Sequence, residues 1–271
     1  MKRKYTCIFS IFILTISLFG CSSAAKEPKV LTDTDFIVNM GKALEARWKF
    51  VDSSESSSEV IEKMSTSEYQ SYLTKCVTAE TDILKSYDDY VFENEDLAKL
   101  AKQYFFALEL QKEGVKYART NNYLDYEQTF DLGYNYRVVL VNDLYENFDL
   151  KVNEKYSKNL NDFIALSSTS KKFISIQEFV NSLSETLSYT KDEEKSNEYS
   201  TYYKAIIENT TDYTIDSLTI EIDFLDASGV VINQTSDHLK NLTAGKKIES
   251  SILIKNENFE SMEFTITAYN N

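Results

Sequence analysis

Three charged residues lie on otherwise apolar faces of predicted helices: Arg47, Glu80 and Arg137. Arg47 precedes Val51 by four residues and Arg137 precedes Leu144 by seven, so each arginine shares the inner face of its helix. Glu80 has the same inward position on another helix. The chain contains only four arginines, so two in such positions stand out. A guanidinium can hold a carboxylate or a phosphate through two parallel hydrogen bonds, which is the chemistry these residues could perform.

Two interpretations of Arg47, Glu80 and Arg137 follow. A lone buried charge costs several kcal/mol, so inward arginines need partners. The expected role is an Arg–Glu network that fixes the register of a helical bundle. The alternative is an interhelical pocket in which the arginines bind the carboxylate or phosphate of a ligand.

The helices that position these residues follow from the spacing of apolar side chains at intervals of three and four. The pattern predicts a helix from about residue 33 to 51, and the serine-rich stretch 53–58 predicts a loop. Further helices are predicted over about 69–87, 94–119, 123–148 and 156–164, with a break at Asn121-Asn122. Consecutive amphipathic helices with short loops favour an antiparallel bundle, which we place at residues 33–172.

The pattern changes after residue 166. Ser167 to Ser170 are predicted to form a linker, and 173–183 could form one more short helix. From Ser184 onward strands are expected, because apolar and polar residues alternate strictly over 218–224. Turn residues at 226–229 and 243–245 separate further apolar runs. The expected fold class is α+β multidomain, with a linker and an antiparallel β-sandwich of about seven strands at residues 173–271.

The N-terminus has the features of a bacterial secretion signal. Cations occupy residues 2–4, an apolar run covers 5–19, and small Gly20 precedes Cys21. The run is shorter than the ~20 residues needed to cross a bilayer. Leu18-Phe19-Gly20-Cys21 resembles the lipobox of bacterial lipoproteins. That resemblance implies a signal peptide at 1–20, a diacylglyceryl group on the Cys21 thiol, and a tether at 21–32. The chain would then be anchored to the bacterial cell membrane on its extracellular side. The alternative is a secreted protein with a free thiol at Cys21.

Cysteine, charge and histidine content narrow the function classes. Cys7 would leave with the signal and Cys21 would carry lipid, so Cys76 stays unpaired and is expected in the core. Without the three signal cations, 26 basic residues face 43 acidic ones, a net charge of −17. This charge disfavours nucleic acid as a partner and favours cations, although solubility alone would explain it. The single histidine, His238, cannot form a histidine metal cluster. Spacing in the acidic stretch 88–96 does not match an EF-hand, so neither a metal nor a cofactor is expected.

The predicted β region resembles the FxLYD family of bacterial immunoglobulin-like domains over about residues 197–271. The stretch Ile222-Asp223-Phe224-Leu225-Asp226 stands at the family motif and shares Asp226 with it. Glu208-Asn209-Thr210-Thr211 and Leu242-Thr243-Ala244-Gly245 resemble the family's turns. The resemblance implies an immunoglobulin-like sandwich with no catalytic residue. Asp226 is expected to order its turn by accepting backbone hydrogen bonds.

The helical part is similar in architecture to surface lipoproteins of Gram-positive bacteria. We therefore expect a lipid-anchored extracellular protein that acts by binding or envelope scaffolding rather than catalysis, with a protein or peptide partner at the cell surface. No sequence motif of a nucleotide-binding loop, serine hydrolase or zinc protease occurs. The alternative is a binding protein for a cationic peptide or small ligand, using the acidic surface or an Arg47/Arg137 pocket.

Overall fold

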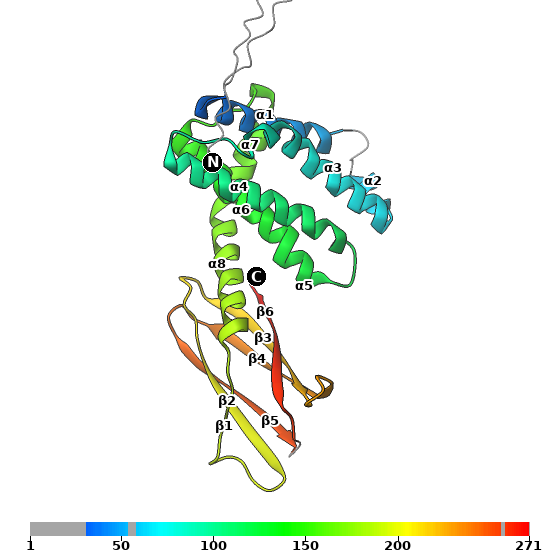
Figure 1. Ribbon diagram of the computed structural model, residues 1–271, viewed down its shortest axis with the longest axis vertical. Helices are drawn as coiled ribbons and strands as arrows, with labels where there is room; N and C mark the ends of the chain where they lie inside the picture. The colour runs from blue at the N-terminus through cyan, green and yellow to red at the C-terminus, as the bar shows by residue number, and fades with distance from the viewer. Residues whose placement is uncertain (1–30, 54–57, 256–257, 271) are drawn as a thin grey trace, which may run out of the picture. The chain divides into compact units, whose positions relative to one another are not determined.

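The computed structural model describes residues 31–53, 58–255 and 258–270 (Figure 1). The predicted signal peptide 1–20 and Cys21, with most of the predicted tether, lie outside these residues. Among the described helices, none combines the length and apolar character needed to span a bilayer.

The N-terminal part is helical. Its α-helices are α1 (Asp33–Val51), α2 (Ser58–Lys63), α3 (Thr66–Leu84), α4 (Glu95–Gly114), α5 (Tyr123–Tyr126), α6 (Leu132–Phe148), α7 (Ser157–Ile164) and α8 (Ser167–Thr186). Short 3₁₀ turns follow α3 and α4 at Lys85–Tyr87 and Val115–Tyr117, and a third precedes α7 at Glu154–Tyr156. The predicted long helices are confirmed, because their apolar residues at three- and four-residue spacing form the inner faces. The short helix α2 was not predicted.

Polar caps set where the long helices begin. The Thr32 side chain accepts a hydrogen bond from the backbone of α1, and Ser65 and Glu68 cap α3 reciprocally. Asn94 accepts from two backbone N–H groups of α4. These contacts satisfy N–H groups that have no partner within the helix, which explains the positions of the boundaries.

The predicted helix 123–148 is continuous, but its centre is wider than an α-helix. A π-helical turn at Glu127–Asp131 separates α5 from α6. α4 and α6 approach so closely that a Cβ on Gly133 would lie 2.5 Å from the carbonyl oxygen of Ala107. A Cβ on Gly114 would clash with the backbone nitrogen of Phe130 in the π-helical turn. Only glycine therefore permits this packing.

The predicted linker at Ser167 to Ser170 is wrong, because these residues form the first turn of α8. Ser167 and Ser170 are buried, and the Ser170 N–H donates to the Leu166 carbonyl. Their small side chains permit close packing inside the helical part, so a serine-rich composition does not mark a loop here. The predicted boundary between residues 172 and 173 falls within α8.

The C-terminal part forms two antiparallel sheets. The strands are β1 (Thr190–Lys191), β2 (Ser200–Glu208), β3 (Ile215–Leu225), β4 (Val231–Leu242), β5 (Lys247–Lys255) and β6 (Ser261–Tyr269). One sheet has the order β1-β2-β5 and the other β4-β3-β6. The described residues thus hold six strands instead of about seven.

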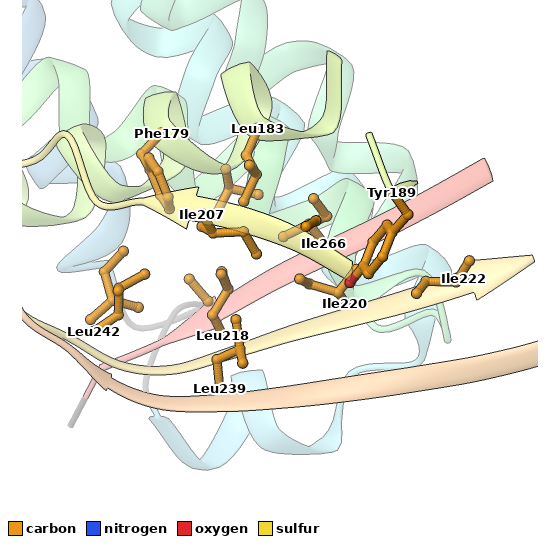
Figure 2. Packing of buried hydrophobic residues seen from close by; sticks show 14 of the residues in the cluster. Phe179, Leu183, Tyr189, Ile207, Leu218, Ile220, Ile222, Leu239, Leu242 and Ile266 are labelled. Atoms are coloured by element: carbon orange, nitrogen blue, oxygen red, sulfur yellow. The ribbon is translucent and has the colours of Figure 1, made fainter. Parts of the chain in front are cut away.

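Both sheets and α8 share one hydrophobic core. Leu218, Ile220 and Ile222 on β3 are completely buried, as their alternation with polar residues predicted. In Figure 2, Leu218 and Ile220 lie below Phe179 and Leu183 of α8, and Ile222 lies to the right, near Tyr189. Burying a large apolar side chain stabilises a fold by about 1.5–3 kcal/mol, so this layer fixes α8 against the sheets.

Asn209 joins the turn at residues 209–213 to the turn at residues 242–245. Its Nδ2 donates to the carbonyl oxygens of Tyr213 and Leu242, each at 2.8 Å. Its Oδ1 accepts from the N–H and the hydroxyl of Thr211. Its own carbonyl accepts from Gly245. The side chain is fully buried and uses all its hydrogen-bonding capacity.

Asp226 orders the β3–β4 turn, as expected. Its Oδ1 accepts from the Ser228 N–H at 2.8 Å, the Ser228 hydroxyl at 2.6 Å and the Val230 N–H at 3.0 Å. These bonds hold the pKa of Asp226 below its usual value, and the bond from the Ser228 hydroxyl has the largest effect.

Candidate functional site

The structure brings Arg47, Glu80 and Arg137 together from α1, α3 and α6. Arg47 Nη1 donates to Glu80 Oε2 at 3.0 Å. Arg137 Nη2 lies 2.8 Å from both carboxylate oxygens of Glu80. One glutamate thus pairs with two arginines.

Two residues of α4 complete this charge cluster, and sequence reasoning did not single them out. The Tyr104 hydroxyl donates to Glu80 and accepts from Arg137 Nε at 3.4 Å. Arg47 Nη1 also donates to Gln111 Oε1 at 2.9 Å. Gln111 follows Tyr104 by seven residues, so both lie on one helix face. That spacing was the available signal.

The charge cluster carries one surplus positive charge. Glu80 is completely buried, and Arg137 and Arg47 are 1% and 9% exposed. Burial alone would raise the pKa of Glu80, but the charges of Arg137 and Arg47 outweigh it and hold this pKa below its usual value. Burial raises the pKa of Tyr104, so its hydroxyl stays neutral. Both guanidinium groups remain protonated. Two positive charges therefore face one negative charge.

A pocket of about 340 Å³ adjoins the cluster, and both arginines line it. We call it the arginine pocket. Its aromatic walls are Trp48, Tyr69, Tyr72, Phe130, Tyr134 and Phe163. Cys76 and aliphatic side chains complete the described lining, which contains no acidic residue.

Each arginine keeps part of its guanidinium for a further partner. Both hydrogen bonds of Arg47 use Nη1, so Nε and Nη2 have no hydrogen-bond partner among the described residues. Arg137 uses Nε and Nη2, and its Nη1 has no such partner in the same part of the chain. Since both residues line the pocket, these nitrogens can donate to an anion bound there.

The π-helical turn supplies one wall of the arginine pocket. It carries Phe130, whose ring stacks on Tyr126 at 5.2 Å between centroids. π-helical turns occur frequently at functional sites, because the extra residue redirects side chains. Asp131 in the same turn has its pKa raised to about 6 by burial and by nearby Glu127.

Arg119 holds the outer wall of the pocket. Its guanidinium lies 4.1 Å from the centre of the Tyr69 ring, and its Nη2 donates to the Ile61 carbonyl at 2.7 Å. Ile61 and Tyr69 both line the pocket. Of the three arginines beyond the predicted signal peptide, Arg47 and Arg137 line the pocket, and Arg119 packs on the ring of Tyr69, one of its lining residues.

Cys76 is buried and unpaired, as expected for a core cysteine. Burial raises the pKa of its thiol, which is therefore neutral and a poor nucleophile. It lines the arginine pocket, so the rate at which a thiol reagent modifies it can report on binding there.

Other candidate features have structural partners. Within the described ranges, no three His, Cys, Asp or Glu side chains are placed to hold a metal ion. A larger hollow of about 790 Å³ lies along α1 and residues 148–153. Its charged groups are engaged: Lys151 pairs with Asp149, and Glu45 accepts from the Asn153 N–H.

No protein-family model, curated protein or solved structure matches this chain.

Proposed function

We propose that this protein is anchored to the bacterial cell membrane by lipid on Cys21 and acts at the cell surface by binding. Its helical part captures a small organic anion in the arginine pocket. The observation that carries the proposal is the surplus positive charge of the Arg47–Glu80–Arg137 cluster beside an aromatic pocket with no acidic lining residue.

The surplus positive charge of the cluster favours an anion as the ligand. A buried charge without a counter-charge costs free energy, and a bound anion offsets that cost. Aromatic walls supply apolar contact at small loss of side-chain entropy. The Arg–Glu network and the anion site are therefore compatible, because Glu80 balances only one of the two arginines.

The anchor and the C-terminal part complete the proposal. Two acyl chains hold a protein stably at a membrane, whereas one chain binds reversibly. The C-terminal sheets are proposed to form an immunoglobulin-like sandwich of FxLYD type. Two antiparallel three-stranded sheets with a common core, and the turns built by Asn209 and Asp226, support this assignment.

Trp48 provides the test of anion binding, because it is the only tryptophan in the chain and lines the arginine pocket. Fluorescence of the full chain in detergent is titrated with 3-phenylpropionate, phenyl phosphate, benzenesulfonate and cationic benzylamine. At least one anion should change Trp48 emission saturably, while benzylamine should not. The Lys112→Gln variant, altered at an exposed residue, serves as control. Absence of binding by all three anions would refute the proposed function.

The anchor has a separate test in cells. Wild-type protein should incorporate labelled fatty acid and sediment with membranes, and Cys21→Ala should do neither. Full membrane partition and labelling of Cys21→Ala would contradict lipidation at this residue.

A further inference from the structure

We infer that the ligand of the arginine pocket is a monocarboxylate attached to a flat apolar body of about one ring, an inference that rests on the proposed function. Three observations limit the ligand: the charge balance, the arginine nitrogens that have no hydrogen-bond partner among the described residues, and the lining of the pocket.

Charge limits the ligand to a monoanion. Arg47 and Arg137 are positive, Glu80 is negative, and Tyr104 and Cys76 are neutral, which leaves one positive charge to balance. A carboxylate balances it. A phosphate monoester carries about −1.5 to −2 near neutral pH and would leave excess negative charge beside the buried cluster.

Arginine geometry favours a carboxylate. Nε and Nη2 form one edge of a guanidinium, with two parallel N–H groups. In Arg47 this edge is the unoccupied one, because Nη1 makes the bonds to Glu80 and Gln111. In Arg137 the same edge is occupied by Tyr104 and Glu80. Arg47 can therefore bind both oxygens of a carboxylate, and Arg137 Nη1 can add one further donor.

The size and lining of the pocket limit the part of the ligand beyond its carboxylate. A volume of about 340 Å³ is about eleven times the roughly 30 Å³ that one water molecule occupies in the liquid, which is enough for one ring and a short chain. The aromatic walls favour a flat body that stacks against them. Since no lining residue is acidic, an ammonium group on the ligand would have no counter-charge. A zwitterionic amino acid should bind less well than the corresponding acid.

The carboxylate could belong to a free acid or to the C-terminal residue of a peptide. The experiment uses the full chain and Trp48 emission, with 3-phenylpropionate, 3-phenylpropionamide, phenyl phosphate and phenylalanine as probes. Acetyl-Gly-Phe with a free carboxylate and its C-terminal amide separate the two sources. We expect 3-phenylpropionate to bind at least tenfold more tightly than its amide, phenyl phosphate or phenylalanine. Comparable binding of acetyl-Gly-Phe would assign the peptide source, and weaker binding the free acid.

The Arg47→Lys variant tests the two-nitrogen edge, because lysine keeps the charge without the planar fork. It should weaken 3-phenylpropionate at least tenfold, and the exposed Lys49→Gln variant on the same helix should leave binding unchanged. Urea unfolding verifies that Arg47→Lys is folded. On the unmutated chain, 3-phenylpropionate should also slow modification of the Cys76 thiol, which needs no variant.

The outcomes separate the two proposals. Tighter binding of phenyl phosphate, or equal binding of acid and amide, overturns the carboxylate assignment while the anion site stands. If no anion changes Trp48 emission or the rate of Cys76 modification, both the carboxylate assignment and the anion site are refuted.

Discussion

Glu80 is the electrostatic centre of the helical part. It accepts hydrogen bonds from Arg47, Arg137 and Tyr104, which belong to three other helices. Because these partners hold its pKa below the usual value, its ionised form stabilises the fold. This contribution is fully present above the unfolded pKa of about 4.3 and is lost as the pH falls through the lower folded pKa.

Replacing Glu80 by Gln should cost about 3–5 kcal/mol of unfolding free energy at pH 7, because two buried arginines lose their counter-charge. Urea denaturation measures this loss. The matched control is Glu109→Gln on α4, whose ion pair with Lys112 is exposed and contributes less than about 1 kcal/mol. A cost for Glu80→Gln no larger than that of the control would contradict the network.

In the C-terminal part, Asn209 has a role like that of Glu80, because its side chain joins several backbone segments. Replacing it by Ala should cost about 3 kcal/mol, because buried carbonyl groups of Tyr213 and Leu242 lose their donors. The neighbouring, exposed Thr210 serves as control, and Thr210→Ala should cost less than about 0.5 kcal/mol. Thermal unfolding compares the two variants, and equal values would exclude a special role for Asn209.

Among the elements, the π-helical turn combines an unusual backbone with partly buried carboxyls. Burial raises the pKa of Glu127, and burial together with Glu127 raises the pKa of Asp131 to about 6. A carboxyl whose pKa is higher in the folded state opposes folding when ionised. The penalty of Asp131 is therefore absent below its ordinary pKa of 3.8 and complete above about pH 6.

Asp131→Asn should consequently stabilise the protein at pH 7.5, by about 1 kcal/mol after allowance for solvent screening, and have little effect at pH 4. Urea midpoints at the two pH values measure the difference. Asp125→Asn, at an exposed site on α5, is the control and should change the unfolding free energy by less than about 0.5 kcal/mol. A stabilisation that is equal at both pH values would exclude ionisation of Asp131 as its cause.

At the scale of the whole molecule, the excess of acidic residues opposes folding by self-repulsion. Raising the salt concentration from about 0.01 M to about 0.1 M shortens the Debye length from about 30 Å to about 10 Å. The melting temperature should therefore rise by a few degrees with sodium chloride. Equal concentrations of glycerol control for non-ionic effects. A falling melting temperature would mean that exposed ion pairs such as Lys99–Asp96 outweigh the repulsion.

The fold could be predicted from sequence where one local pattern decides it. Period-3.6 spacing identified the long helices, and strict alternation identified β3 and its buried face. The linker predicted at Ser167 to Ser170 was wrong, because packing and not composition decides whether small polar residues form a helix. The π-helical turn also escaped prediction, since it depends on contact with α4 around Gly114.

The candidate site was only partly predictable for the same reason. The spacing of apolar residues shows which positions lie on the inner face of a helix, so Arg47, Glu80 and Arg137 were identified. Which nitrogen of Arg47 pairs with Glu80, and which edge stays open, depends on how α1 and α3 approach each other. Gln111 was missed because its seven-residue spacing from Tyr104 places both on one helix face but does not show that the amide contacts Arg47.

The sequence by itself determined a helical part followed by strands, a strongly acidic chain, and inward charges that require partners, because composition and periodicity are local properties. Only the tertiary structure decided that Glu80 balances one arginine's charge and leaves another beside an aromatic pocket. Pairing and pocket shape arise from contacts between α1, α3, α4 and α6, which are separated along the chain and meet only in the folded bundle.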